Sequence, residues 1–150
     1  MNDVVLNKIA SIQRCIQRAR EEFAADPDGF DTDFTRQDAA TLNVLRACEQ
    51  AIDLANHVIK TRQLGVPTSS ADSFDLLRQA GILDDELTRQ LQKMVRFRNI
   101  VIHNYERLAL AVLRSVITDN LDDLLAFGQQ ILTFLDSMTG EDRRTSPQER

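Results

Sequence analysis

Apolar side chains recur at intervals of three and four residues along most of the chain, which is the spacing of one face of an α-helix. Near the start, these positions are Val5, Ile9, Ile12, Ile16, Ala19 and Phe23. The pattern stops before residues 26–33, DPDGFDTD, where proline and glycine are typical of a turn. The sequence therefore predicts a first helix that ends before this turn.

The next apolar face is wider. Thr35, followed three residues later by Asp38, has the pattern of a helix start. Two adjoining apolar stripes follow: Leu45, Cys48, Ile52, Ala55 and Ile59, and beside them Val44, Ala47, Ala51, Leu54 and Val58. The rest of this helix is a polar stripe of Arg46, Glu49, Asp53, Asn56 and Lys60. A face of this width is more than a single neighbouring helix would cover.

Three more helices follow a connector that contains proline, glycine and serine. Ser70 is typical of a helix cap and Gly81 of a helix stop, so a short helix is predicted between them. Asp84 starts another helix, and the last one begins near Leu110. The apolar positions of this last helix are Leu113, Ile117, Leu121, Leu124, Ile131, Leu135 and Met138. Gly128 falls on the same seam, where it fits either a close helix approach or a plain tolerated glycine.

These patterns predict an all-α protein with one domain. No segment alternates apolar and polar residues as a strand would, and 150 residues leave no room for a second domain of normal size. Beyond Gly140 the sequence is polar and has no period. We therefore expect a domain over residues 1–138 and a polar, disordered tail over residues 139–150.

Composition narrows the setting of the protein. No apolar run approaches membrane-spanning length, and the first residues lack a signal peptide's apolar stretch, so we expect a cytoplasmic protein without a membrane partner. Cys15 and Cys48 lie within helical patterns, which favours reduced core thiols over a disulfide or a metal site. The net charge of −5 argues against indiscriminate binding to nucleic acid, DNA included, but leaves room for a local basic patch.

Residues 96–106, RFRNIVIHNYE, place polar side chains where a helical seam favours apolar ones. The seam of Leu87, Leu91 and Met94 continues at Arg98. Arginine is almost never fully buried without a partner. Two explanations stay open: the guanidinium reaches water at the surface, or it points into a cleft between subunits or beside an anionic ligand.

His103 lies near a second face of the same helix. That face carries Arg89, Lys93 and Arg96, with Asn99 one turn before the histidine. The face suits contact with phosphate groups, although a solvated charged surface is the default interpretation. At about 100° per residue, Arg98 projects roughly 140° away from His103. If both act on one substrate, the helix must end or kink near His103, or two copies must meet.

The sequence RNIVIHNY, residues 98–105, matches the R-x4-H-x-Y motif of HepT toxins, which are HEPN ribonucleases. The short motif alone is weak evidence because Arg and His five positions apart often occur by chance. Three longer segments also resemble HepT segments in the same order: LRACEQAIDLANHVI, LGVPTSSADSFDLLRQAGILDDEL and KMVRFRNIVIHNYERL. The resemblance covers nearly the whole chain except its tail.

This resemblance implies an antiparallel HEPN bundle of four long helices and one short helix, which forms a homodimer or a higher oligomer. The wide apolar face of the second helix fits such a dimer. The activity implied is metal-independent endonucleolytic cleavage of RNA, without a cofactor. The implied catalytic residues are Arg98, Asn99 and His103, for phosphate stabilisation, orientation and proton transfer respectively. The candidates for RNA binding are Arg89, Lys93 and Arg96.

HepT toxins are paired with a small nucleotidyltransferase antitoxin, MntA, which transfers AMP to the tyrosine of the motif. Carried over, that tyrosine is Tyr105, the only one in the chain. Adenylates beside His103 would add bulk and negative charge that block an RNA phosphate. Without the resemblance, Tyr105 would be interpreted as an amphipathic ring at an interface. Asn104 stands where HepT proteins often have aspartate, which leaves Arg98, His103 and Tyr105 intact.

The resemblance therefore implies the toxin component of a toxin–antitoxin pair. One alternative is a non-catalytic subunit that binds substrate or nucleotide for a nucleotidyltransferase, and another is a structural dimer. The set of Arg98, Asn99 and His103 favours cleavage, because a companion subunit has no need for it. Glu49 and Asp53, one turn apart, are interpreted as ordinary surface residues with a weaker case for a supporting role.

Overall fold

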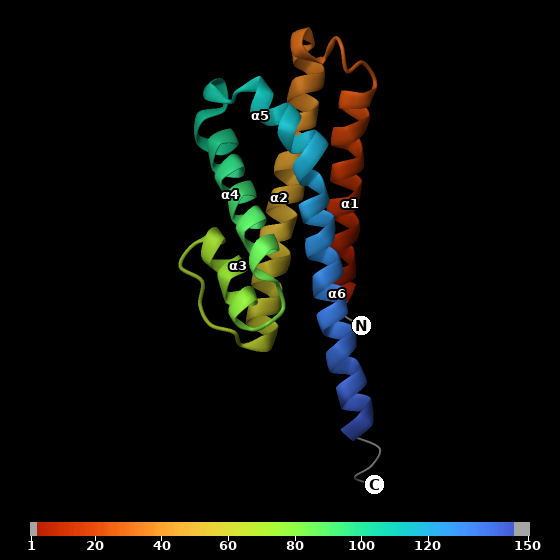
Figure 1. Ribbon diagram of the computed structural model, residues 1–150, viewed down its shortest axis with the longest axis vertical. Coiled ribbons are helices and arrows are strands. Elements are labelled where there is room, and N and C mark those ends of the chain that lie inside the picture. Colours follow the sequence, from red (N-terminus) through yellow and green to blue (C-terminus); the bar gives the residue numbers. More distant parts are fainter. Residues whose placement is uncertain (1–2, 146–150) are drawn as a thin grey trace.

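A computed structural model describes residues 3–145, with side chains described up to residue 138, and this part of the chain is helical without strands (Figure 1). The helices are α1 (Asp3–Ala24), α2 (Phe34–Arg62), α3 (Ser70–Gln79), α4 (Asp85–Asn104), α5 (Leu110–Ser115) and α6 (Leu121–Thr145). Short 3-10 turns, η1 (Phe30–Thr32) and η2 (Tyr105–Arg107), precede α2 and follow α4, and a π-helical segment, η3 (Val116–Asn120), joins α5 to α6. The predicted all-α class with four long helices and one shorter helix is confirmed, and the predicted last helix is the run α5–η3–α6.

Helix α2 lies in the middle of the bundle and packs against α1, α3, α4 and α6 (Figure 1). Its buried side chains include four alanines, Ala40, Ala47, Ala51 and Ala55, which let neighbouring helices approach closely. Every residue of the two predicted apolar stripes except Leu45 is buried by helices of the same chain. The wide apolar face of α2 therefore has several neighbouring helices, as its width predicted. Because these helices belong to the same chain, the face does not indicate a dimer.

Polar side chains fix where the helices begin. The Asp33 carboxylate accepts a hydrogen bond from the Arg36 backbone N–H at 3.1 Å, so α2 starts earlier than the Thr35 pattern indicated. Ser69, rather than Ser70, caps α3 by accepting from the Asp72 N–H at 3.0 Å. The predicted start at Asp84 is confirmed, because its carboxylate accepts from the Leu87 N–H at 2.7 Å.

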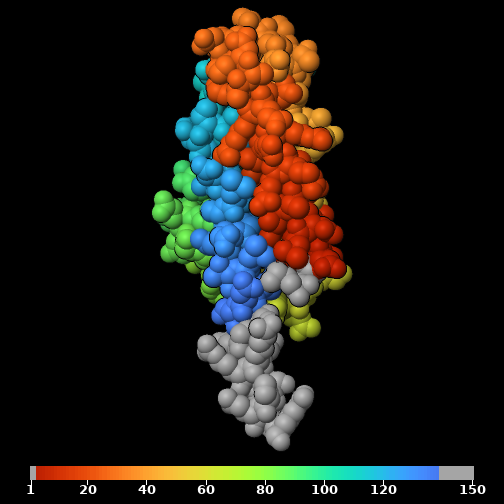
Figure 2. Space-filling view, turned by 90° about the vertical axis from the view of Figure 1, so that its right-hand side faces the viewer, coloured from red at the N-terminus to blue at the C-terminus, as the bar shows by residue number. Residues whose placement is uncertain are grey.

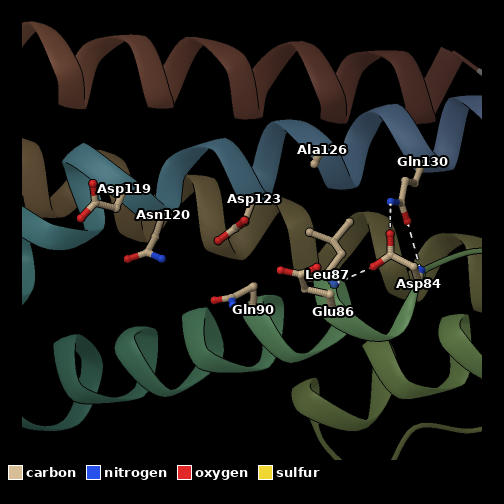
Figure 3. Close-up of a pocket in the computed structure, with 9 residues that line it drawn as sticks. All are labelled: Asp84, Glu86, Leu87, Gln90, Asp119, Asn120, Asp123, Ala126 and Gln130. Carbon is tan, nitrogen blue, oxygen red and sulfur yellow. Dashed lines mark hydrogen bonds between the residues drawn. The ribbon is translucent and has the colours of Figure 1, made fainter.

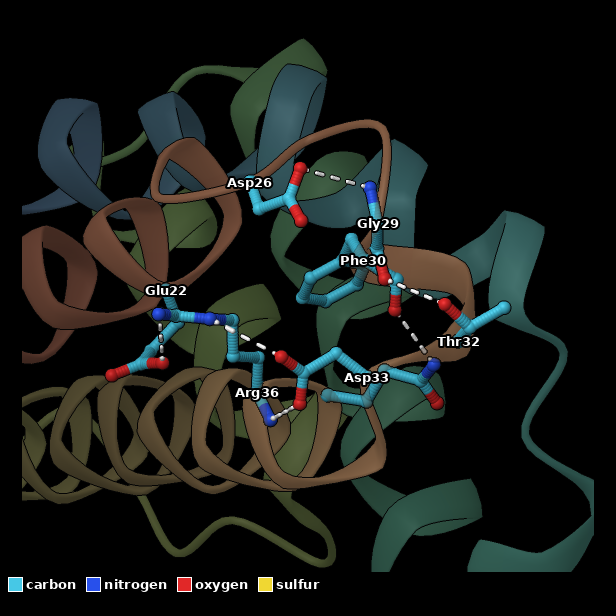
Figure 4. A network of polar contacts seen from close by, with 8 residues as sticks. Glu22, Asp26, Gly29, Phe30, Thr32, Asp33 and Arg36 are labelled. Carbon is cyan, nitrogen blue, oxygen red and sulfur yellow. Dashed lines mark hydrogen bonds and ion pairs between the residues drawn. The ribbon is translucent and has the colours of Figure 1, made fainter.

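An ion-pair network ties the end of α1 to the start of α2 (Figure 4). The Arg36 guanidinium lies 3.2 Å from Glu22 Oε2 and 3.3 Å from Asp33 Oδ2. In the turn, the Asp26 carboxylate accepts from the Gly29 N–H at 3.1 Å. Because these groups are partly exposed, they contribute little free energy but hold the turn in one conformation.

Helix α6 continues without a break past residue 138, the predicted end of the domain. Residues 139–145 are therefore helical rather than irregular. The physical reason is that Gly140 alone does not stop a helix, and the following Glu and Arg residues are good helix formers. Residues 146–150, the rest of the predicted tail, lie outside the described residues.

Both cysteines are free thiols, as predicted. Cys48 is buried on α2, and burial raises the pKa of its thiol to about 12. The thiol therefore stays protonated and unreactive at neutral pH. Within the described residues, no helix combines the length and the apolar character needed to cross a membrane.

Gly128 marks a close approach between α1 and α6, which lie side by side in Figure 2. A Cβ atom at this position would lie 3.4 Å from two carbon atoms of Ile9. That distance is the short end of ordinary van der Waals contact. The position therefore has room for a methyl group but not for a longer side chain.

We expect Gly128→Ala to increase the free energy of unfolding by about 0.5–1 kcal/mol, because alanine removes the cost of glycine in a helix interior. Gly128→Leu is expected to lower it, since the longer side chain would push α6 away from Ile9. Urea unfolding of both variants measures the difference. A less stable alanine variant would contradict this view of the α1–α6 contact.

Candidate active site at the end of α4

Arg98 is held in a half-buried position by polar groups from three helices. Its Nε atom lies 2.6 Å from Glu49 Oε1 on α2, and its side chain is 17% exposed. Its Nη2 donates to Ser70 Oγ on α3 at 2.9 Å, and its Nη1 donates to Asn99 Oδ1 at 2.7 Å. The contact with Glu49 is an ion pair of two buried atoms that lacks the alignment of a hydrogen bond. The explanation that the guanidinium simply reaches water was therefore wrong.

Glu49 has a clear contact with the motif, and Asp53 does not. Asp53 points to α1, where its Oδ2 atom lies 3.6 Å from Lys8 Nζ. Because Ser69 rather than Ser70 caps α3, the Ser70 hydroxyl is left for Arg98. An arginine on an apolar seam indicates that a carboxylate partner exists. Helical periodicity does not identify which carboxylate that is.

His103 is the penultimate residue of α4 and is exposed. Its imidazole forms no hydrogen bond or ion pair within the described part of the chain. Because α4 is regular from Arg98 to His103, the two side chains project to different sides, as the helix geometry predicted. The helix ends directly after His103, at Asn104, where φ is −157° and ψ is 48°. One chain therefore does not bring Arg98 and His103 onto a common face.

Tyr105 begins the turn after α4, and its side chain contacts α2. Its hydroxyl donates a hydrogen bond to Asp38 Oδ1. Burial, together with this hydrogen bond to a carboxylate, raises the pKa of Tyr105 above its usual value. Asp38 thus lies within the span of α2, where it holds Tyr105, and it does not mark the start of the helix. Nothing in the local pattern around Asp38 indicated this contact.

Tyr105 and Asp38 both line a pocket of about 270 Å³. Its lining residues are Phe34, Gln37, Asp38, Thr41, Tyr105, Glu106, Leu108, Leu110 and Leu113. Thr41 is 2% exposed, and its side chain beside Tyr105 partly offsets the increase in the pKa of the phenol. The lining contains two carboxylates and no basic side chain.

The three predicted RNA-binding residues, Arg89, Lys93 and Arg96, are exposed and form no salt bridge within the described residues. Arg89 and Lys93 each influence a nearby carboxylate. The charge of Arg89 is one of several influences that lower the pKa of Asp84, after hydrogen bonds from the Leu87 N–H and Gln130. Lys93 acts in the same direction on Asp123, although partial burial and nearby carboxylates raise the pKa of Asp123 on balance. Their role in RNA binding stays a prediction.

These carboxylates belong to a cleft of about 320 Å³ formed by α4, η3 and α6 (Figure 3). Asp84, Glu86, Asp119 and Asp123 contribute negative charge to it, with Gln90, Asn120 and Gln130 as neutral polar neighbours. The cleft would repel an RNA phosphate. Among the residues that the structure describes, no group of three or more His, Cys, Asp or Glu side chains is placed to hold a metal ion.

The sequence also matches proteins of known family. The family described as ribonuclease HepT-like matches residues 12–131 of the chain. The chain belongs to this family. The matched range includes α2, α3 and α4, which carry the candidate site, and extends into α6.

Individual relatives agree with this assignment. The chain is 45% identical over 127 residues to the mRNA nuclease HepT of Shewanella oneidensis, which covers 85% of this chain and 95% of the relative. A solved structure of a tri-AMPylated Shewanella oneidensis HEPN toxin in complex with MNT antitoxin matches with a TM-score of 0.84 and 44% identity, over 89% of this chain and 99% of that one. A structure of a toxin–antitoxin with AMP-PNP matches with a TM-score of 0.84 and 42% identity, over 88% of this chain and 99% of that chain.

We expect Glu49→Ala and Arg98→Ala to show a coupling of about 1 kcal/mol in a double-mutant cycle of unfolding free energy, because this pair is partly shielded from water. The matched control is the longer and more exposed Lys8–Asp53 pair, for which the coupling is expected to stay below about 0.3 kcal/mol. Chemical denaturation of the single and double variants measures both. Equal couplings would show that Glu49 does not hold Arg98.

Proposed function

We propose that this HepT-like ribonuclease is the toxin of a toxin–antitoxin pair and cleaves RNA endonucleolytically through Arg98, Asn99 and His103. The likeness to an mRNA nuclease supports RNA as the substrate, and such a substrate would place the activity in the cytoplasm. The observation that carries the proposal is the end of α4, where a firmly held arginine is followed five residues later by an exposed histidine that has no hydrogen bond or ion pair among the described residues.

The proposed chemistry divides into proton transfer and charge stabilisation. A histidine exchanges protons near neutral pH, so His103 would take the proton of a ribose 2′-hydroxyl or give one to the leaving 5′-oxygen. Arg98 has five N–H groups, of which one meets Glu49, one Ser70 and one Asn99. Two remain for the oxygens of the scissile phosphate. The reaction in this form requires no metal ion.

Two copies of the chain are proposed to complete the site. Within one chain, Arg98 and His103 point to different sides of α4. Around the motif, Ile100 and Ile102 expose 42% and 49% of their surface. Covering them with a second copy would remove apolar surface from water and bring the two motif segments together. The two histidines would then share the acid and base roles.

We also propose that a MntA-like nucleotidyltransferase antitoxin neutralises the enzyme by transferring AMP to Tyr105. The similar Shewanella oneidensis HEPN toxin is described as tri-AMPylated and in complex with MNT antitoxin, which supports this proposal. Tyr105 is the only tyrosine of the chain and lies two residues after His103. Adenylate phosphates beside His103 would repel an RNA phosphate and occupy its space.

We expect His103→Ala to reduce RNA cleavage by at least about 100-fold, because general acid–base catalysis typically contributes this much. His57→Gln, which changes the other histidine of the chain, serves as the matched control and is expected to retain cleavage. A labelled messenger RNA incubated with each variant in the presence of EDTA measures the rate. Nucleotide binding without any cleavage by the wild-type chain would instead identify a non-catalytic subunit of a nucleotidyltransferase.

A further inference from the structure

We infer that Asp38 accepts the proton of the Tyr105 hydroxyl during adenylyl transfer, so that the modified protein supplies a catalytic residue for its own modification. This inference rests on the proposed function, because it concerns the transfer of AMP to Tyr105. It adds a residue outside the R-x4-H-x-Y motif, on a different helix, to the chemistry of neutralisation.

The contact between Asp38 and Tyr105 brings together residues that are 67 positions apart in the sequence. The tyrosine hydroxyl donates its hydrogen to Asp38 Oδ1, so the proton already points to the group that would receive it. The Asp38 residue is exposed and lines the same pocket as Tyr105. A proton that reaches Asp38 can therefore pass to water.

The surroundings of Tyr105 create a need for such a base. Burial and the neighbouring Asp38 carboxylate raise the pKa of the phenol, and the pocket has no basic side chain in its lining to stabilise a phenolate. The hydroxyl is therefore neutral at physiological pH. A neutral phenol is a weak nucleophile unless its proton leaves as the new bond forms.

The other groups of the pocket do not meet this need. Glu106 is the second carboxylate in the lining, but it forms no hydrogen bond with the tyrosine among the described contacts. Thr41 has a hydroxyl in the same pocket, and a neutral hydroxyl is a much weaker base than a carboxylate. Asp38 is thus the base that the geometry selects.

The step balances with ATP as the co-substrate. A bond forms between Tyr105 Oη and the α-phosphorus of ATP, and the bond from that phosphorus to the oxygen bridging to the β-phosphorus breaks. Pyrophosphate leaves with the electron pair of the broken bond. The hydroxyl proton moves to Asp38 Oδ1 and from there to water.

The test measures adenylylation of the full-length chain by the Shewanella oneidensis MNT antitoxin with ATP and Mg²⁺, followed by intact mass. Asp38→Asn keeps an acceptor oxygen beside the hydroxyl but removes its basicity. We expect kcat for the first AMP addition to fall about 100-fold with an unchanged KM for the toxin. Asp38→Glu, which keeps a carboxylate, is expected to recover part of the rate.

Glu106→Gln is the matched control, because it removes one negative charge from the same pocket without touching the hydroxyl. It is expected to be modified within about twofold of the wild-type rate. Thermal unfolding of all variants, monitored by circular dichroism, checks that Asp38→Asn folds like the wild-type chain. If Asp38→Asn alone is unstable, the Asp38→Glu rate relative to that of Glu106→Gln decides.

Three outcomes would overturn the inference while the proposed function stands: a wild-type rate in Asp38→Asn, an effect confined to KM, or an equal loss in Glu106→Gln. The first shows that no base is needed from this chain, the second that Asp38 only positions Tyr105, and the third that pocket charge alone matters. A wild-type chain that gains no AMP would overturn the proposed neutralisation itself, and the inference with it.

Discussion

The burial of the wide apolar face of α2 is the constraint on which the rest of the structure depends. Its alanines and its two apolar stripes are covered by α1, α3, α4 and α6. Each of these helices must therefore present an apolar seam to α2, and their registers along it are linked. The same helix supplies Glu49 to Arg98 and Asp38 to Tyr105. The core and the candidate active site thus share one supporting element.

The two contacts also show how α4 is laid along α2. From Arg98 to Tyr105 the chain advances, whereas the partners on α2 go back from Glu49 to Asp38. This order is that of an antiparallel pair of helices (Figure 1). The seven positions from Arg98 to Tyr105 correspond to eleven positions on α2, from Glu49 back to Asp38. The two numbers differ because the chain leaves α4 after Asn104 and reaches α2 through the turn. The end of α4 therefore leaves His103 exposed without a hydrogen bond or ion pair among the described residues and sets the Tyr105 hydroxyl against Asp38 of α2.

Charge is distributed unevenly around this framework. The net charge is −5, and four carboxylates gather in the cleft between α4 and α6. Arg98 is on the side of α4 that faces α2 and α3, where Glu49 and Ser70 hold its guanidinium. The pairing with Glu49 compensates much of the cost of removing a cation from water. It also fixes the orientation in which the remaining N–H groups can meet a phosphate.

Periodicity determined what is local: the all-α class, the helix starts to within about two residues, and the divergent directions of Arg98 and His103. The R-x4-H-x-Y motif came from the resemblance to HepT toxins. Periodicity did not determine which carboxylate meets Arg98, that Asp38 meets Tyr105, or that the wide face of α2 is covered within one chain. The physical reason is the separation along the sequence between the residues that interact. Helix formation depends on neighbours three and four positions away, whereas these contacts depend on the register between helices far apart in sequence, which only the packing of the whole bundle decides.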